Sequence, residues 1–214
     1  MSMRCMIHLR HGGLIAVMLT GTAGRPVPKV LVDAGEHAEN LYDAAKANMW
    51  VTAGRRLESL AADVARLHTV ADSGSRTGAD RLDREVAALR SSLIRRERHE
   101  TMVEANQVTL VVANMTGAYE PRVPIAVTRL DFYGRELEIW SEAGAAARLD
   151  SAARGVRHEW DGVHSAVSAR SPAVARKFDS LVTRVERAES PAEYRRLARQ
   201  ELAEVDDLER VFER

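Results

Sequence analysis

The chain has 214 residues, and its 31 basic and 31 acidic side chains cancel to a formal net charge of zero at pH 7. A chain of this length can fold by burying apolar surface, without disulfide or metal cross-links. Because a neutral protein has no global field that attracts polyanions, we expect no nucleic-acid partner and no purely electrostatic attachment to an anionic membrane.

The N-terminus resembles a secretory signal peptide. Arg4 and Arg10 precede the apolar run LIAVMLTGTAG, which is too short to span a bilayer, and small residues follow up to Ala23. We therefore expect residues 1–23 to be removed on export to the periplasm or beyond, and no transmembrane span in the mature chain. The alternative is a cytoplasmic protein with a disordered or mis-started N-terminus. Cleavage after Ala23 would remove Cys5, the single cysteine, and with it any disulfide or thiolate chemistry.

A long helix is predicted over residues 37–69, after a flexible lead-in over residues 24–36. Its apolar stripe is clearest in the second half, at Leu57, Leu60, Val64 and Leu67, where the spacing is typical of a helix face turned to a core. The next segment, TVADSGSRTGAD, is rich in Gly, Ser, Thr and Asp and is predicted to be a loop.

The following segment repeats apolar residues at spacings of four, three and four, at Leu82, Val86, Leu89 and Leu93, which predicts a strong amphipathic helix. The charged run IRRERHE then interrupts the pattern. Either one long helix has a solvated middle, or two helices meet near Ser91 or Arg98. The β-branched run VTLVVANM also fits a buried strand, but its helical flanks favour a helix.

A central helix is predicted within residues 121–144, beginning near Pro124, because proline is well tolerated at early helical positions. On a helical projection its apolar residues form two lines. Leu130, Leu137 and Trp140 lie on one side, while Ile125, Phe132 and Ile139 lie on the other. A helix that is apolar on two sides is covered on two sides, so we expect it to join two halves of the fold, with Gly134 allowing another backbone to approach.

A polar strip separates these two lines and provides the candidate ligand-binding residues, which are Asp131, Arg135 and Glu138. Arg135 is spaced to pair with Asp131 at i−4 and with Glu138 at i+3. Such a strip is commonly a solvated helix face. Alternatively, it lines a cleft between the two halves, where a guanidinium between carboxylates would orient a polar ligand.

The C-terminal part, residues 145–214, is predicted to be a second helical unit that matches a first unit over residues 37–120. Ser171 before Pro172 indicates one helix start, and the Ser190-Pro191-x-Glu193 pattern is a capping box. An offset of 100 residues aligns RRERHETMVEANQVTLVV with RRLARQELAEVDDLERVF, and an offset of 110 aligns Trp50 with Trp160. An internal duplication is therefore one interpretation, and a single integrated helical domain is the other.

Histidine and acidic side chains suggest one metal site, at His158, Asp161 and His164, with further ligands from another helix. No histidine has Glu three residues before it, which argues against a di-iron carboxylate bundle. Haem ligation by a methionine and a histidine remains open, so the cofactor is unknown. Phosphate-binding loops, dinucleotide fingerprints, nucleophile elbows and zinc-protease motifs are missing from the sequence, so we expect no enzymatic activity.

These patterns together predict an all-α protein, an antiparallel helix bundle of four or more helices, with the option of two tandem helical units joined by the central helix. The sequence is similar to exported bacterial helix-bundle proteins in class only. We expect an exported, non-enzymatic protein that binds a small ligand or a metal ion between its helices. The alternative is a structural or partner-binding protein of the cell envelope that has no ligand.

Overall fold

The computed structural model describes residues 25–70 and 73–213, and this part of the chain is entirely helical, without a strand. The predicted all-α class and bundle packing are confirmed. The helices are α1 (Lys29–Lys46), α2 (Trp50–Val70), α3 (Ser73–Arg95), α4 (Arg98–Thr116), α5 (Ile125–Ala143), α6 (Ala146–Arg170), α7 (Pro172–Glu186) and α8 (Pro191–Glu213). The predicted signal peptide, residues 1–23, lies outside the described residues.

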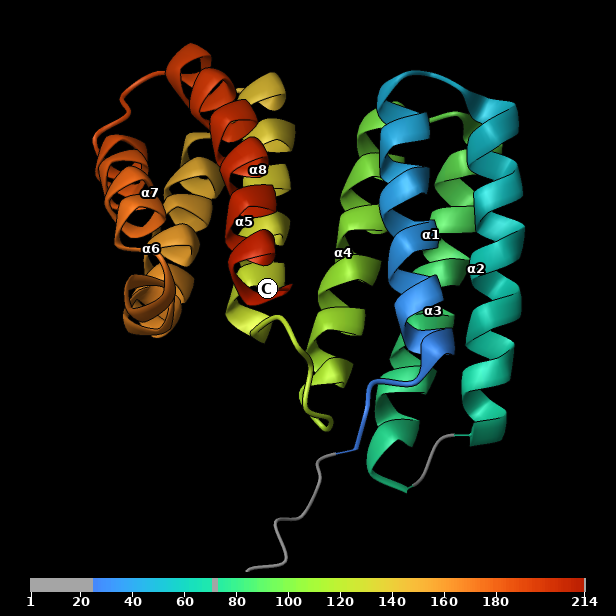
Figure 1. Cartoon of the computed structure of the whole chain (residues 1–214). Helices are drawn as coiled ribbons and strands as arrows, with labels where there is room; N and C mark the ends of the chain where they lie inside the picture. Colours follow the sequence, from blue (N-terminus) through green and yellow to red (C-terminus); the bar gives the residue numbers. More distant parts are fainter. Residues whose placement is uncertain (1–24, 71–72, 214) are drawn as a thin grey trace, which may run out of the picture.

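The helices form two groups of four, which lie side by side in Figure 1. In the first bundle, α1–α4, each helix packs on the next one and α4 closes the ring against α1. The second bundle, α5–α8, repeats this arrangement, and α8 closes on α5. Contacts between α4 and α5 join the bundles. The central helix, α5, is therefore a full member of the second bundle. This corrects the prediction of a separate helix that links two units.

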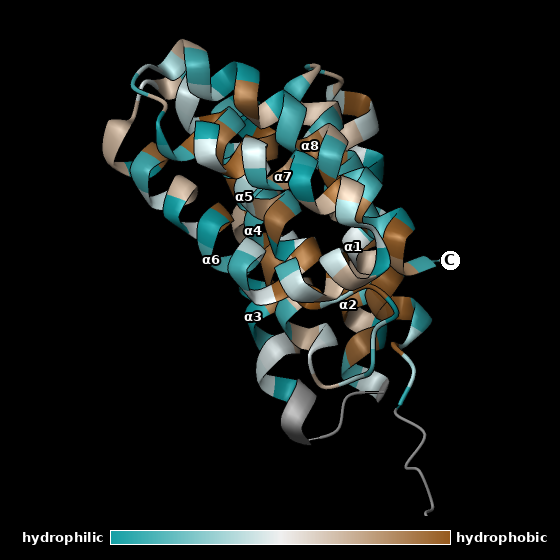
Figure 2. Ribbon diagram, turned by 60° about the vertical axis from the view of Figure 1, so that its left-hand side comes forward, coloured by the Kyte–Doolittle hydropathy of each residue, from teal (hydrophilic) through white to brown (hydrophobic). Residues whose placement is uncertain are grey.

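Each bundle has its own hydrophobic core, and the hydrophobic residues in Figure 2 lie mainly on the helix faces that meet inside the bundles. Leu41 and Met102 are buried in the first core, whereas Leu137 and Trp160 are buried in the second. Ile139 of α5 belongs to the first core, although its helix is part of the second bundle. The prediction that α5 is covered on two apolar sides is thus confirmed.

The helix predicted over residues 37–69 is two helices, because the chain turns at residues 47–49. Asn48 takes a left-handed conformation with φ 56°, which asparagine adopts more readily than most residues. The N–H of Met49 donates to the carbonyl of Ala44 and that of Asn48 to Ala45, as in a Schellman cap. The expected flexible lead-in is also wrong from Lys29 onward, because Leu31 and Ala34 are buried and anchor α1.

The segment expected to be a loop forms the first turns of α3 from Ser73 onward. Packing explains its composition: a Cβ on Gly78 would lie 2.6 Å from the Cγ of Met115 on α4. Ala79 and Leu82 are fully buried beside it. A small residue at position 78 therefore permits close contact between α3 and α4. The same composition is typical of loops, which is why the sequence predicted a loop here.

The two alternatives for the IRRERHE region are resolved in favour of two helices, which meet at Arg96 and Glu97. Arg96 is left-handed, with φ 56°, and the N–H of Glu97 donates to the carbonyl of Ser92. VTLVVANM is helical within α4. The short turn makes α3 and α4 antiparallel neighbours.

Both helix starts predicted in the C-terminal part are confirmed, because α7 begins at Pro172 and α8 at Pro191. Pro172 is the first residue of α7, although the Ser171 side chain makes no capping hydrogen bond. At α8 the capping box is complete: the N–H of Glu193 donates to Ser190 Oγ at 3.3 Å, and the N–H of Ser190 donates to Glu193 Oε2 at 3.2 Å.

The repeated ring of four helices fits one of the two internal alignments. An offset of 100 residues places much of α4 on α8, the last helix of each bundle. An offset of 110 instead pairs Trp50, the first residue of α2, with Trp160 in the interior of α6. The topology is therefore compatible with the first alignment only.

Candidate ligand-binding cleft

A pocket of about 260 Å³ lies where α1 of the first bundle meets α5 and α8 of the second, and we call it the cleft. All three candidate ligand-binding residues of α5 line it. The full lining consists of Tyr42, Asp43, Lys46, Asp131, Arg135, Glu138, Leu202, Ala203 and Asp206. The polar strip of α5 thus faces a space between the bundles.

Arg135 lies at the centre of the polar contacts, with only 11% of its side chain exposed. Its Nη1 is 2.6 Å from Asp131 Oδ2, and its Nη2 is 3.8 Å from Glu39 Oε2 on α1. The guanidinium carbon lies 5.4 Å from the centroid of the Tyr42 ring. Two carboxylates and one aromatic face therefore stabilise this buried charge.

Glu138 is buried and pairs across the bundles with α1 rather than with Arg135. The Tyr42 hydroxyl donates to Glu138 Oε2 at 2.8 Å, and Lys46 Nζ lies 2.7 Å from the same carboxylate. Burial, followed by the nearby charge of Glu138, raises the pKa of Tyr42, so the phenol stays protonated and remains a donor. The expected i+3 pair is replaced by contacts that hold the bundles together.

Two carboxylates of the cleft differ from the rest because they are exposed and unpaired. Asp43 on α1 and Asp206 on α8 line the cleft, and neither has a hydrogen bond or ion pair within the described part of the chain. Both cations of the lining, Lys46 and Arg135, already contact carboxylates. Four acidic residues against two basic ones leave the cleft with an excess of negative charge.

Glu201 of α8 directly precedes Leu202, which lines the cleft. Glu201 itself is fully buried, with 0% of the residue exposed. Neither carboxyl oxygen has a hydrogen-bond partner among the described residues. Burial, then the charge of Asp131, raises the pKa of Glu201 well above its usual range, and Arg135 opposes this shift. Burial without a hydrogen-bond partner therefore favours the neutral form of Glu201 over the carboxylate.

Gly134 makes room for this carboxyl group. A Cβ on Gly134 would lie 1.8 Å from Glu201 Oε2 and 2.8 Å from Leu202 Cδ2. The sequence predicts close approach of another backbone at Gly134, but the close neighbours are these side chains. A buried glutamate against a glycine was not foreseen, because the two residues are far apart in the chain.

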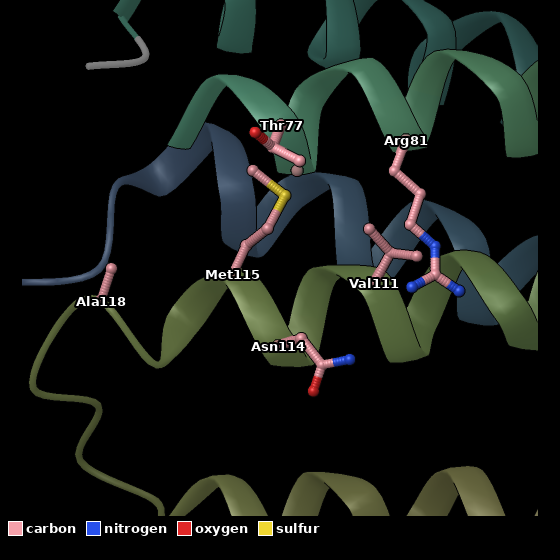
Figure 3. Close-up of a pocket in the computed structure, with 7 residues that line it drawn as sticks. Thr77, Arg81, Val111, Asn114, Met115 and Ala118 are labelled. Atoms are coloured by element: carbon pink, nitrogen blue, oxygen red, sulfur yellow. The ribbon is translucent and has the colours of Figure 1, made fainter. Parts of the chain in front are cut away.

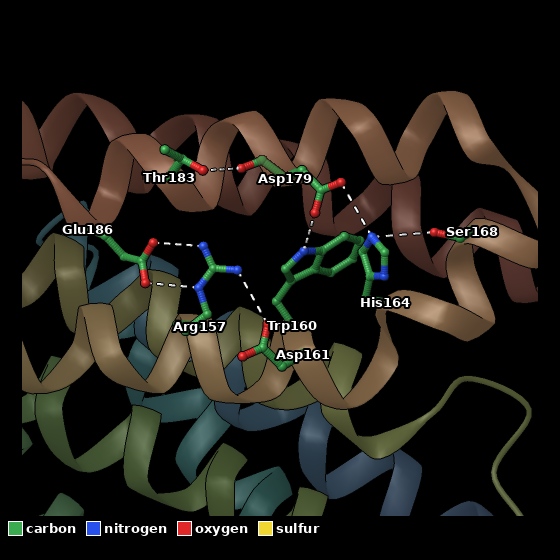
Figure 4. A network of polar contacts seen from close by, with 8 residues as sticks. All are labelled: Arg157, Trp160, Asp161, His164, Ser168, Asp179, Thr183 and Glu186. Carbon is green, nitrogen blue, oxygen red and sulfur yellow. Dashed lines mark hydrogen bonds and ion pairs between the residues drawn. The ribbon is translucent and has the colours of Figure 1, made fainter.

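The metal site expected on α6 is not assembled by the structure. Figure 4 shows that Asp161 faces Arg157, at 3.3 Å, while His164 faces Asp179 of α7, with Nε2 and Oδ2 3.3 Å apart. His164 is six positions after His158, a spacing that turns their side chains roughly 120° apart on a helix. As a correction, His158, Asp161 and His164 do not converge as a ligand set.

A different group of potential metal ligands comes together at the adjacent ends of α2 and α3. One ligand atom each from His68, Asp80 and Asp83 lies within 4.8 Å of the others, and His68 Nε2 is 2.7 Å from Asp83 Oδ2. Sequence reasoning missed this group because its members lie on two helices. The two aspartates are exposed, and the histidine is already hydrogen-bonded, so the group gives no further support for a metal ion.

Other pockets have less concentrated polar chemistry. Figure 3 shows one of about 310 Å³ between α3 and α4, where Met115 and Val111 contribute apolar surface and Arg81 is the charged residue. Another, of about 470 Å³, lies between α6, α7 and α8, and its Asp207 and Arg210 pair with each other at 2.8 Å. At the cleft, the buried charges of Arg135 and Glu138 on α5 meet charged side chains of α1 from the other bundle, which is why we consider it the candidate site.

The sequence did not identify the half of the cleft that comes from α1 and α8. Tyr42 and Lys46 lie 96 and 92 residues from Glu138. On α1 they follow an ordinary amphipathic pattern, so the only available signal was the i, i+4 spacing of an aromatic and a lysine.

Comparison with known protein families, curated proteins and solved structures found no significant match. None of the described helices is both long enough and apolar enough to cross a membrane. The chain is therefore characterised by its fold class, an all-α protein of two joined four-helix bundles, and by the chemistry of the cleft.

Proposed function

We propose that the protein is a non-enzymatic binding protein that takes a small organic cation, with one or two ammonium groups, into the cleft between its bundles. The observation that carries this proposal is the pair of unpartnered carboxylates, Asp43 and Asp206, which come from opposite bundles. Each cation of the cleft is already paired, so the free polar groups are hydrogen-bond acceptors and a donor-rich cation complements them.

Size supports a small ligand. The cleft volume of about 260 Å³ is slightly below the roughly 300–1,000 Å³ of pockets that bind drug-sized ligands. The two ammonium groups of a short alkyl diamine complement the two carboxylates in charge, and its methylene groups complement the apolar lining residues Leu202 and Ala203. An exposed acidic site also binds cations less tightly as salt increases, because screening weakens such interactions.

We expect wild-type protein to bind 1,4-diaminobutane and not succinate, a probe of similar length and opposite charge. Replacing Asp43 and Asp206 together by Asn should weaken binding by up to about thirtyfold, because each exposed ion pair contributes roughly 0.2–1 kcal/mol. Isothermal titration calorimetry at low salt measures this. Asp150→Asn, which removes an exposed acid of α6 outside the cleft, is the matched control and should bind as wild type does. Equal binding by the double variant would contradict the proposal, as would tighter binding of succinate.

We further propose that this binding takes place outside the cytoplasm, in the periplasm or beyond. The order of basic, apolar and small residues before Arg25 supports this location. Intact-mass measurement of protein from native cells should give a mature N-terminus close to residue 24. A chain that retains residue 1 and fractionates with the cytoplasm would refute export.

A further inference from the structure

The guanidinium of Arg135 lies 2.6 Å from Asp131 and 3.8 Å from Glu39, and its charge also acts on Glu201 and Glu209 of α8. We call these four acidic residues the Arg135 cluster. They come from α1, α5 and α8, so the cluster extends across the boundary between the bundles. One positive charge cannot compensate four negative charges in a partly buried region, because each uncompensated carboxylate has lost hydration.

Glu201 is the member for which this imbalance is largest. It is fully buried and lacks a hydrogen-bond partner among the described residues, whereas Asp131 has a direct contact with Arg135 at 2.6 Å. Such surroundings favour the protonated form of a carboxyl group, because the neutral form needs less solvation than the carboxylate.

The helices that pack against α8 are α5, α6 and α7, and each presents charged groups in the region of Glu201. On α5 they are Asp131 and Arg135, and on α8 itself Glu204. Lys177 of α7 lies 3.8 Å from Glu204 and 3.0 Å from Asp207, so its charge is already balanced there. On α6, Glu159 faces Arg129 at 3.7 Å. None of these cations contacts Glu201.

Glu39 of α1 is the more accessible member, with 41% of its side chain exposed. It faces Arg135 and Asp131 on α5, Glu209 on α8 and Asp43 on α1. The other helices that pack on α1 carry charged residues that pair with residues other than Glu39. Asp63 of α2 contacts His37, and Arg98 of α4 contacts Glu142.

The pKa directions agree with this geometry. Burial is the main cause of the raised pKa of Asp131, Glu201 and Glu209. Burial also raises the pKa of Glu39, but water at its exposed surface limits that shift. The effect is most pronounced at Glu201, which is fully buried and has no hydrogen-bond partner among the described residues.

We propose that the Arg135 cluster stores a proton at neutral pH, principally on Glu201, and releases it when a cation enters the cleft. This exchange rests on the proposed function. The O–H bond of the Glu201 carboxyl group breaks, its electron pair stays on the carboxylate, and the proton leaves to solvent. The entering ammonium supplies the positive charge that stabilises the new carboxylate.

Linkage fixes the sign of the pH dependence. A ligand that releases one proton binds more tightly as pH rises, by up to tenfold per pH unit, while the stored proton is being displaced. By reciprocity, acidification returns the proton and expels the cation.

The stored proton is testable without a ligand, by ¹³C NMR of protein labelled at the glutamate carboxyl carbons. The Glu201 signal is assigned by its loss in Glu201→Gln and should have the shift of a neutral carboxyl group at pH 7. The matched control is Glu58, an exposed glutamate of α2 that is paired with Arg90 at 2.7 Å. Its signal is assigned by its loss in Glu58→Gln, and in the wild type it should have the shift of a carboxylate. An ionised Glu201 at pH 7 would overturn the inference.

Exchange is tested by calorimetry with 1,4-diaminobutane in phosphate and in Tris, whose different ionisation enthalpies reveal proton release. We expect release of up to one proton by wild type and by Glu58→Gln, and less by Glu201→Gln. Binding without proton release, or equal release by Glu201→Gln, refutes the exchange alone. A neutral Glu201 in a protein that binds no diamine refutes the proposed function and the exchange with it.

Discussion

Gly134→Ala is expected to destabilise the protein by about 1–3 kcal/mol, as overpacking of a close-packed site does. The new Cβ would lie 1.8 Å from Glu201 Oε2 and 2.8 Å from Leu202 Cδ2. Glu201 ends a flexible side chain, but complete burial leaves its carboxyl group little space into which to move. Chemical denaturation monitored by circular dichroism gives the change in the free energy of unfolding.

Gly162→Ala on α6 is the matched control, because a Cβ there has no neighbour within 4 Å. Alanine should stabilise this helix by about 0.5–1 kcal/mol, since it loses less backbone entropy on folding than glycine. A double-mutant cycle with Glu201→Ala adds a second check: removing the carboxyl group should reduce the penalty of Gly134→Ala. Stabilisation by Gly134→Ala in the wild-type background would contradict the packing described here.

Glu201→Met is expected to stabilise the protein by about 1–3 kcal/mol at pH 7, because it removes a buried polar group without partners and keeps a similar volume. Glu201→Gln keeps a neutral polar group at the same place and should stay within about 1 kcal/mol of wild type. Glu58→Met, at an exposed position, should change stability by no more than about 0.5 kcal/mol. Thermal or urea unfolding of the three variants measures the differences, and a large loss of stability in Glu201→Met would disprove the expected gain.

The pH dependence of stability follows from the same residue. The pKa of Glu201 in the folded state is raised above its usual value of 4.5, so in the unfolded state the group ionises first. Above about pH 4.5 the unfolded state binds fewer protons than the folded state, and the contribution of Glu201 to stability decreases as pH rises toward the folded pKa. Unfolding measured from pH 4.5 to 8 should show a smaller decrease for Glu201→Gln than for wild type. Equal slopes would contradict a raised pKa.

Local patterns explain which parts of this fold were predictable. The spacing of Leu82, Val86 and Leu89 and the Ser190–Glu193 capping box are set by residues a few positions apart, and both predictions agree with the structure. The two-sided apolar pattern of α5 correctly predicted its place between two cores. Such features depend on helix periodicity, which is visible in any short window of sequence.

Features that depend on distant contacts were not predictable in this way. The turn at Asn48 interrupts an apolar pattern that would also suit one continuous helix, and Gly78 resembles a loop residue until Met115 is placed against it. In the cleft, Asp131, Arg135 and Glu138 were visible as a strip, but their partners on α1 were not. Helix packing, which sets these contacts, is not encoded in the spacing of any single segment.

The position of Ile139 has a consequence for how the two bundles fold. This side chain of α5 is fully buried in the core of α1–α4, while Tyr42 and Lys46 of α1 hold Glu138. Loss of either bundle would open a cavity in the other core or leave a buried carboxylate without its donors. The two halves, despite separate cores and a repeated topology, are therefore expected to unfold in one cooperative transition rather than as independent modules.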